Sequence, residues 1–160
     1  MKVIFLDIDG VLNYQEFGGL HRGGIGVSEE KIKLLKHIVD NTGAIIVLTS
    51  TWKLHWEKDS SNQHPSGVYL DTLFANEGLE IYDKTPLSVS ERGRGIYQYI
   101  TDNKVDEWVV LDDEVFPDFA EFGIMPHLVK SSFYKEGLTY KLAEKAIDIL
   151  NNGVSNGNIN

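Results

Sequence analysis

The chain has 160 residues, 42% of them apolar and 24% charged, which is the composition of a folded domain rather than of a disordered segment. It contains no cysteine, which excludes disulfides, a cysteine nucleophile and thiolate metal sites. The net charge of −9, from 24 acidic and 15 basic residues, argues against a broad surface that follows nucleic-acid phosphates.

Neither membrane insertion nor secretion is indicated. No apolar run approaches the roughly 20 residues that span a bilayer. The N-terminal residues MKVIFLDIDG contain one lysine, end in acids and offer no small-residue cleavage site, so we expect no signal peptide and a cytoplasmic location. Residues 1–152 are expected to form a single domain, and the Gly- and Asn-rich residues 153–160 a disordered tail.

Apolar runs alternate with helical patterns along the chain. Residues 2–6 predict a buried strand that ends in acids, and the glycine-rich residues 11–27 predict a loop or short hairpin. Ser28 is a suitable N-cap for a helix that ends at Gly43. The later patterns predict strands at 44–48, 107–111 and 127–130, helices at about 92–102 and 139–151, and loops at 60–67 and 123–126.

Strands that are apolar on both faces and separated by helices are typical of a parallel sheet covered on both sides. The predicted fold is therefore a three-layer α/β sandwich with a mostly parallel, Rossmann-like sheet. Ligands of such sheets bind at the carboxyl ends of the strands. The residues that follow three of the predicted strands are all polar, namely Asp7–Asp9, Thr49–Ser50 and Asp112–Asp113.

Two acidic elements are candidates for binding a metal. Asp7 and Asp9 lie two residues apart before Gly10, and Asp112 and Asp113 follow a later strand. Carboxylates this close repel one another unless a cation compensates, and Mg²⁺ prefers such oxygen ligands. Each element also has a structural explanation, because Asp and Gly are ordinary turn residues and acids after a strand often cap the next helix.

Two further elements are candidates for binding a phosphoryl group. Thr49 and Ser50 offer hydroxyls at a strand end, although such residues also cap helices. Arg92 and Arg94 lie near a predicted helix start, where cations are unfavourable. A bound anion would explain these arginines, and simple solvation is the alternative.

In this order the elements resemble the haloacid dehalogenase (HAD) superfamily. The sequence has DxDGV at 7–11, a strand ending in Thr and Ser, a basic residue at a helix start and a strand ending in two aspartates. The resemblance covers roughly residues 1–150. A closer similarity, to small HAD domains associated with nucleic-acid repair proteins, rests on TSTW, RGRGI, LDDE, and HLVK followed by EGLT.

The resemblance implies a Mg²⁺-dependent phosphatase. Asp7 would be the nucleophile that forms an aspartyl-phosphate, and Asp9 the general acid and base. Mg²⁺ would be bound by the Asp7 carboxylate, the Asp9 backbone carbonyl and Asp113, with Asp112 as a second ligand or orienting group.

The resemblance also suggests which residues meet the phosphoryl oxygens. Thr49 is preferred over Ser50 because it directly follows the apolar run. Arg92 is preferred over Arg94, and its replacement by Ala is expected to lower turnover with the fold intact. The family more often has lysine at this position, although arginine occurs.

The substrate is less defined than the reaction. Residues 11–30 and 52–90 are the places where a cap could insert, and both are too short for a full cap domain, so a capless or minimally capped enzyme is expected. The substrate stays open between a nucleotide, a nucleic-acid end phosphate and another small phosphometabolite. Trp52 and Trp56 could stack on a base or pack in the core, and His21 and Arg22 could reach a substrate or be solvated.

Other functional classes compete with the phosphatase. A phosphotransferase or phosphomutase would share the aspartate nucleophile, although a mutase usually has a larger cap. A catalytically inactive binding or regulatory module would keep the fold, but the joint presence of the candidate residues argues against it. A receiver-type phosphorylation switch would not require Asp9.

Overall fold

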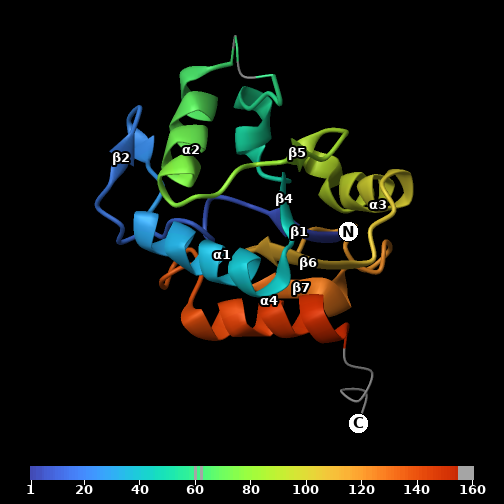
Figure 1. The fold of residues 1–160 in the computed structure, drawn as a ribbon. Coiled ribbons are helices and arrows are strands. Elements are labelled where there is room, and N and C mark those ends of the chain that lie inside the picture. Colours follow the sequence, from blue (N-terminus) through green and yellow to red (C-terminus); the bar gives the residue numbers. More distant parts are fainter. Residues whose placement is uncertain (60, 62, 155–160) are drawn as a thin grey trace.

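The computed structural model describes residues 1–59, 61 and 63–154, and its centre is a five-stranded parallel sheet (Figure 1). The strand order is β5-β4-β1-β6-β7. The bounds are β1 (Lys2–Leu6), β4 (Ile45–Leu48), β5 (Asp83–Lys84), β6 (Glu107–Asp112) and β7 (Leu128–Lys130). The predicted Rossmann-like α/β architecture is confirmed.

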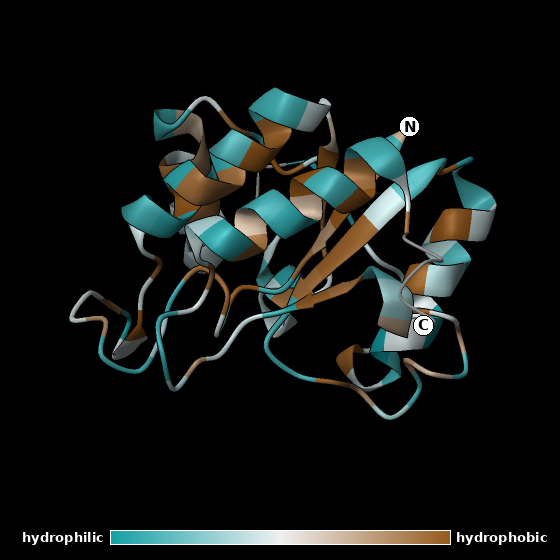
Figure 2. Ribbon diagram, turned by 90° about the horizontal axis from the view of Figure 1, so that it is seen from below, coloured by the Kyte–Doolittle hydropathy of each residue, from teal (hydrophilic) through white to brown (hydrophobic). Residues whose placement is uncertain are grey.

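Helices cover both faces of this sheet. In the described chain they are α1 (Glu29–Thr42), α2 (Pro65–Asn76), α3 (Arg92–Asp102) and α4 (Tyr140–Asn152). Buried residues of α1, α2 and α4 share a core with one face of the sheet, while α3 packs against the other face. Figure 2 shows the result, with hydrophobic strands in the interior and hydrophilic helix surfaces turned outward.

Local signals explain where the predicted helices begin and end. The Ser28 hydroxyl accepts a hydrogen bond from the Lys31 N–H, and Gly43 ends α1 in a left-handed conformation with φ of 72°. The Thr139 hydroxyl caps α4 by accepting from the Leu142 N–H at 3.1 Å. Both caps of α1 predicted from the sequence are confirmed.

A short hairpin lies beside α2, at the left of Figure 1. Its strands, β2 (Leu20–His21) and β3 (Gly24–Ile25), pair in antiparallel fashion. Arg22 and Gly23 connect them with φ values of 50° and 83°. Positive φ at both central residues is the signature of a type I′ turn, whose twist suits a two-residue hairpin loop.

The segment between residues 52 and 90 contains more structure than predicted. A 3₁₀ helix, η1 (Thr51–His55), follows β4, and α2 begins at Pro65, so the loop predicted at 60–67 is wrong for its last residues. His64 starts α2 because its Nδ1 accepts from the Ser66 N–H at 3.0 Å. Strand β5 was missed because it is two polar residues long and has no apolar run.

The structure differs from the prediction at one further loop. The predicted loop at 123–126 overlaps a 3₁₀ helix, η4 (Met125–His127). The predicted tail at 153–160 lies outside the described residues from position 155 onward. Among the described helices, none combines the length and apolar character needed to cross a bilayer.

Strand register brings the polar strand ends together. Leu6, at the end of β1, pairs with the corresponding residues of both β4 and β6. The next residues of the three strands, Asp7, Thr49 and Asp112, therefore lie side by side at the carboxyl edge. The ladder continues for one more step, since the N–H of Asp7 donates to the Leu111 carbonyl at 2.9 Å and that of Thr49 to Leu6 at 3.0 Å.

Candidate functional site

Three aspartates from two strand ends form an acidic cluster at this edge. One carboxylate oxygen each from Asp7, Asp112 and Asp113 lies within 4.8 Å of the others. Asp7 and Asp112 are buried, and Asp113 is half-buried. Within residues 1–59, 61 and 63–154, this is the group whose donors and spacing suit a metal ion.

Arg92 closes the buried side of the acidic cluster. Its Nη1 lies 2.8 Å from Asp112 Oδ2 and 3.2 Å from Asp7 Oδ1, and only 6% of the side chain is exposed. The guanidinium also lies over the Phe116 ring, 4.1 Å from its centroid. The other oxygen of Asp112 accepts from the Glu114 N–H at 3.1 Å, so both Asp112 oxygens already have partners.

Electrostatics explain why this cluster suits a cation. Burial raises the pKa of Asp7 well above its usual range, and the nearby carboxylates of Asp112 and Asp113 raise it further, against the opposing effect of Arg92. Burial also raises the pKa of Asp112, again with Arg92 opposing. A single arginine does not neutralise three carboxylates, and a divalent cation with oxygen ligands fits the remaining charge.

Gly10 lets Asp113 approach the turn that follows β1. Its φ is 86°, and a Cβ at this position would lie 2.2 Å from Asp113 Oδ2. Glycine therefore permits both the turn after β1 and the close approach of Asp113. Ser131 directly follows β7, and its hydroxyl donates to the Gly10 carbonyl and fixes this turn.

Asp9 lies at the exposed rim, beside the buried cluster rather than within it. Its Oδ1 accepts from Asn13 Nδ2 at 2.8 Å, and its Oδ2 accepts from Trp52 Nε1 at 3.1 Å. Asn13 Oδ1 in turn accepts from the Gly10 N–H at 2.9 Å. The sequence carried no signal for Asn13, because its role depends on how the turn folds back.

Thr49 and Ser50 have different environments. Both are fully buried, but Thr49 Oγ1 has no hydrogen-bond partner among the described residues. Ser50 Oγ accepts from the Trp52 N–H at 3.2 Å and caps η1. The Thr49 hydroxyl is therefore available to a ligand, whereas the Ser50 hydroxyl stabilises the backbone.

This difference predicts opposite results for two substitutions. Thr49→Val keeps the side-chain shape and removes an unpartnered hydroxyl, so thermal stability should be unchanged or higher while kcat/KM falls by about 10²- to 10³-fold. Ser50→Ala, the matched control, should lower stability by about 1 kcal/mol and largely keep turnover. Thermal unfolding and phosphatase kinetics on both variants test the assignment, and a fully active Thr49→Val would contradict it.

The two candidate arginines are also separated by the fold. Arg92 reaches the acidic cluster, whereas the Arg94 side chain is 61% exposed and pairs with Glu91 at 3.2 Å. The Gly93 and Arg94 N–H groups at the start of α3 both donate to the Asp118 carboxylate at 3.0 Å. The structure thus brings Arg92, and not Arg94, to the strand ends.

Lys53 is a buried cation that sequence reasoning missed. Its Nζ donates to the carbonyl and hydroxyl of Thr85 at 3.1 and 3.0 Å and to the Pro86 carbonyl at 3.4 Å. Burial, with smaller effects of Arg92 and Lys84, lowers its pKa to about 8. Lys53 ties η1 to the chain after β5, a long-range contact that has no sequence pattern.

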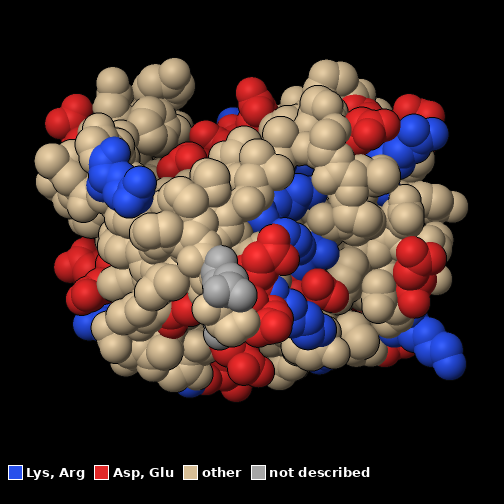
Figure 3. Space-filling view, turned by 90° about the horizontal axis from the view of Figure 1, so that it is seen from above, with Lys and Arg blue, Asp and Glu red and all other residues tan. Residues whose placement is uncertain are grey.

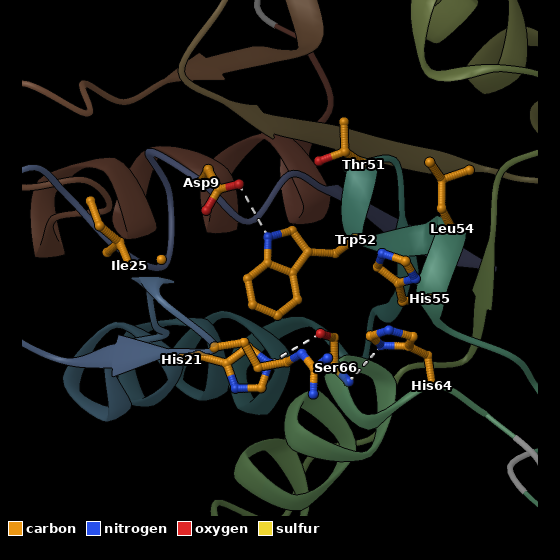
Figure 4. A pocket seen from close by; sticks show the side chains of 11 residues that line it. Asp9, His21, Ile25, Thr51, Trp52, Leu54, His55, His64 and Ser66 are labelled. Atoms are coloured by element: carbon orange, nitrogen blue, oxygen red, sulfur yellow. Dashed lines mark hydrogen bonds between the residues drawn. The ribbon is translucent and has the colours of Figure 1, made fainter.

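A pocket of about 550 Å³ opens beside Asp9, between the hairpin, η1 and the start of α2 (Figure 4). Trp52 is half-buried and lies across it, whereas Trp56 is only 3% exposed and bonds Asp71 from within the core. The pocket is lined mainly by polar and aromatic side chains, including His21, Arg22, Thr51, His55, His64 and Ser66.

Comparison with known proteins identifies one family. A family model described as "HAD domain in Swiss Army Knife RNA repair proteins" matches residues 3–143. Comparisons with curated proteins and with solved structures found no match. The matched range includes every strand of the central sheet except the first residue of β1, together with the whole acidic cluster.

Proposed function

Because the chain belongs to the family of HAD domains found in Swiss Army Knife RNA repair proteins, we propose that it is a Mg²⁺-dependent phosphomonoesterase acting through Asp7. Family membership supports phosphatase-type chemistry. The observation that carries the proposal is a pair of buried donors, Thr49 Oγ1 and Arg92 Nε, that lack partners within the described part of the chain. Both belong to residues that meet at the acidic strand ends, where a phosphoryl group would supply the missing acceptors.

The residues at the strand ends fit a magnesium ion. Asp7 and Asp113 would bind it, and Asp112, with both oxygens already partnered, would orient Arg92 and the cluster. A bound Mg²⁺ would supply the positive charge that lets an anionic carboxylate approach an anionic phosphate. The Asp9 backbone carbonyl remains the predicted further ligand.

In the first step, an Asp7 carboxylate oxygen attacks phosphorus and forms an aspartyl-phosphate. The bond from phosphorus to the ester oxygen breaks, and Asp9 donates a proton to the departing oxygen. The Thr49 hydroxyl and the Arg92 guanidinium donate to the phosphoryl oxygens as negative charge moves onto them.

In the second step, water attacks phosphorus of the aspartyl-phosphate. The Asp9 carboxylate accepts the proton of this water, the bond between phosphorus and the Asp7 oxygen breaks, and inorganic phosphate leaves. Asp7 returns as a carboxylate and Asp9 as an acid, so the cycle is closed.

The proposed substrate is a phosphate monoester on a nucleotide or a nucleic-acid end. The family's connection with RNA repair supports this class. On the face shown in Figure 3, basic and acidic side chains of the described residues are interspersed rather than gathered into a basic track. With a net charge of −9, attraction of such a substrate would depend on Mg²⁺ and on local cations such as Arg92 and Arg22.

Hydrolysis of p-nitrophenyl phosphate tests this proposal directly. We expect turnover with Mg²⁺, a loss of about 100-fold or more on addition of EDTA, and recovery when Mg²⁺ is restored. The same titration followed by thermal unfolding should show stabilisation of about 2.7 kcal/mol at a Mg²⁺ concentration 100 times the Kd. Turnover that is absent, or indifferent to EDTA, would overturn the proposal.

A further inference from the structure

The aromatic residues His21 and Trp52 line the pocket beside Asp9, and Tyr69 supports them from outside the pocket lining. The rings of His21 and Tyr69 are stacked, with centroids 4.0 Å apart and planes 16° apart. The Trp52 ring is close to parallel with both, at 29° to His21 and 25° to Tyr69. Its centroid is 5.7 Å from that of His21. Aromatic rings whose planes are nearly parallel offer a face on which another flat ring can stack.

Trp52 connects these aromatic rings to the catalytic machinery. Figure 4 shows its indole across the middle of the pocket, with the N–H pointing to Asp9. Because a general acid must reach the leaving oxygen, the leaving group departs on the Asp9 side, opposite the attacking Asp7 oxygen. The pocket therefore lies where the leaving group of a phosphate ester must go.

The remaining pocket residues suit a neutral aromatic ligand more than a second phosphate. His55 and His64 stack on each other with ring centroids 4.0 Å apart. Burial and the nearby Arg22 lower the pKa of His21. Burial, with contributions from His55, Arg22 and His21, lowers the pKa of His64, and both shifts favour the neutral imidazole. Neutral imidazoles hydrogen-bond and stack, and Arg22 is the permanently charged cation in the pocket lining.

We propose that this pocket binds the leaving group of the phosphate ester and that this group carries a nucleobase, which stacks on Trp52. The inference rests on the proposed function and deepens it, because it assigns the base of the substrate to one pocket and to stacking on Trp52. The volume of about 550 Å³ lies within the range of small-molecule sites, roughly 300–1,000 Å³. Trp52 is also a positioning residue, because its N–H holds one oxygen of Asp9.

Packing accounts for only part of the environment of Trp52, which lies against the edge of the core. The core position is taken by Trp56, which is buried and satisfies its N–H with Asp71 at 2.9 Å. The hairpin is already attached to α2 by Tyr69, whose hydroxyl accepts from the Val27 N–H at 3.0 Å, and by the His21 contact with Ser66 at 3.0 Å. Trp52 is half-buried and lines the pocket.

Two substrates that differ only in the base test the pocket. Adenosine 5′-monophosphate and ribose 5-phosphate present the same ester, and 3′-AMP tests the other attachment point. For the wild-type protein we expect kcat/KM for the better AMP isomer to exceed that for ribose 5-phosphate by about 5- to 150-fold, the range for stacking one base on an aromatic side chain.

Two variants separate the roles of Trp52. Trp52→Leu removes both the ring and its N–H, so the ratio of kcat/KM for AMP to that for ribose 5-phosphate should fall towards one. Trp52→Phe keeps a ring without the N–H, so kcat should fall by a similar factor for both substrates while much of the AMP preference remains. Tyr97→Leu is the matched control, since Tyr97 is a half-exposed aromatic on α3 packed against Phe122, and both rates should stay at the wild-type level.

A binding measurement keeps this inference separate from the proposed function. In the Asp7→Asn background, AMP but not ribose 5-phosphate should quench tryptophan fluorescence, and the added Trp52→Leu change should abolish the quenching. A wild-type protein that hydrolyses none of these esters, together with intact quenching in the Asp7→Asn variant, would overturn the phosphatase but support the nucleobase pocket. Equal kcat/KM for AMP and ribose 5-phosphate, or no Trp52-dependent quenching by AMP, would overturn the pocket.

Discussion

Replacing Asp7 by Asn should abolish phosphatase turnover and at the same time stabilise the metal-free protein. The loss follows from the nucleophile, because an amide cannot form the aspartyl-phosphate, and a decrease of about 10⁴-fold or more in kcat is typical for such groups. The higher stability of the metal-free variant follows from electrostatics. Asn keeps an oxygen that can accept from Arg92 but removes one of three clustered charges.

The gain in stability should depend on pH in a defined direction. The pKa of Asp7 is raised in the folded protein, so its ionised form disfavours folding at neutral pH. As the pH falls below this raised pKa, the wild-type carboxyl takes up a proton in the folded protein. The free-energy cost of burying its charge then decreases and is lost near the ordinary pKa of Asp. With EDTA at pH 7.5 we expect Asp7→Asn to melt about 2–8 °C higher than wild type, the shift that 1–2 kcal/mol causes at this size, with the difference shrinking towards pH 4.

Asp102→Asn is the matched control, because it removes the same charge from an exposed position at the end of α3. Its activity should match wild type, and its melting temperature should change little at any pH. Adding Mg²⁺ should stabilise the wild-type protein and Asp102→Asn, but Asp7→Asn much less. Asp7→Asn protein that still hydrolyses p-nitrophenyl phosphate at a rate near wild type would remove Asp7 from the mechanism.

Arg92→Ala is expected to impair folding as well as turnover, which changes the expectation from sequence alone. Arg92 is buried between Asp7 and Asp112, so its removal leaves buried carboxylates without their partner. Breaking a buried ion pair by deleting one member costs about 3–5 kcal/mol. Urea unfolding of the metal-free protein should show this loss, and Mg²⁺ should recover part of it because it also compensates the carboxylates.

Arg92→Lys separates the catalytic effect from the structural one. Lysine keeps the charge beside both aspartates but lacks the planar fork and the Nε donor, so the protein should fold while kcat/KM falls roughly tenfold or more. Arg94→Ala provides the comparison, since its exposed pair with Glu91 contributes less than about 1 kcal/mol. An Arg94→Ala variant as inactive as Arg92→Lys would show that the wrong arginine had been assigned.

Some features of the site could be predicted from the sequence because they depend on neighbours along the chain. The buried strands at 2–6, 44–48 and 107–111 were found from apolar runs, and the ends of α1 from Ser28 and Gly43. Since parallel strands present their carboxyl ends at one edge, the polar residues after them could be expected to meet there.

Other features depend on residues that are far apart in sequence and leave no local pattern. Strand β5 is two residues long, and α2 begins inside the segment predicted as a loop, so the pocket between the hairpin, η1 and α2 was not predicted. Lys53 is buried only because the chain after β5 surrounds its ammonium group with oxygens.

The sequence by itself determined that acids and hydroxyls follow the strands of a parallel sheet and that arginines lie at the start of a helix, because periodicity and polarity are local properties. Only the tertiary structure decided which of them face one another. Register placed Thr49 beside Asp7, and helix α3 buried Arg92 against Asp112 while leaving Arg94 in solvent. Asn13 and Trp52 each donate a hydrogen bond to one carboxylate oxygen of Asp9. These choices depend on long-range packing, which one residue's identity and its immediate neighbours do not specify.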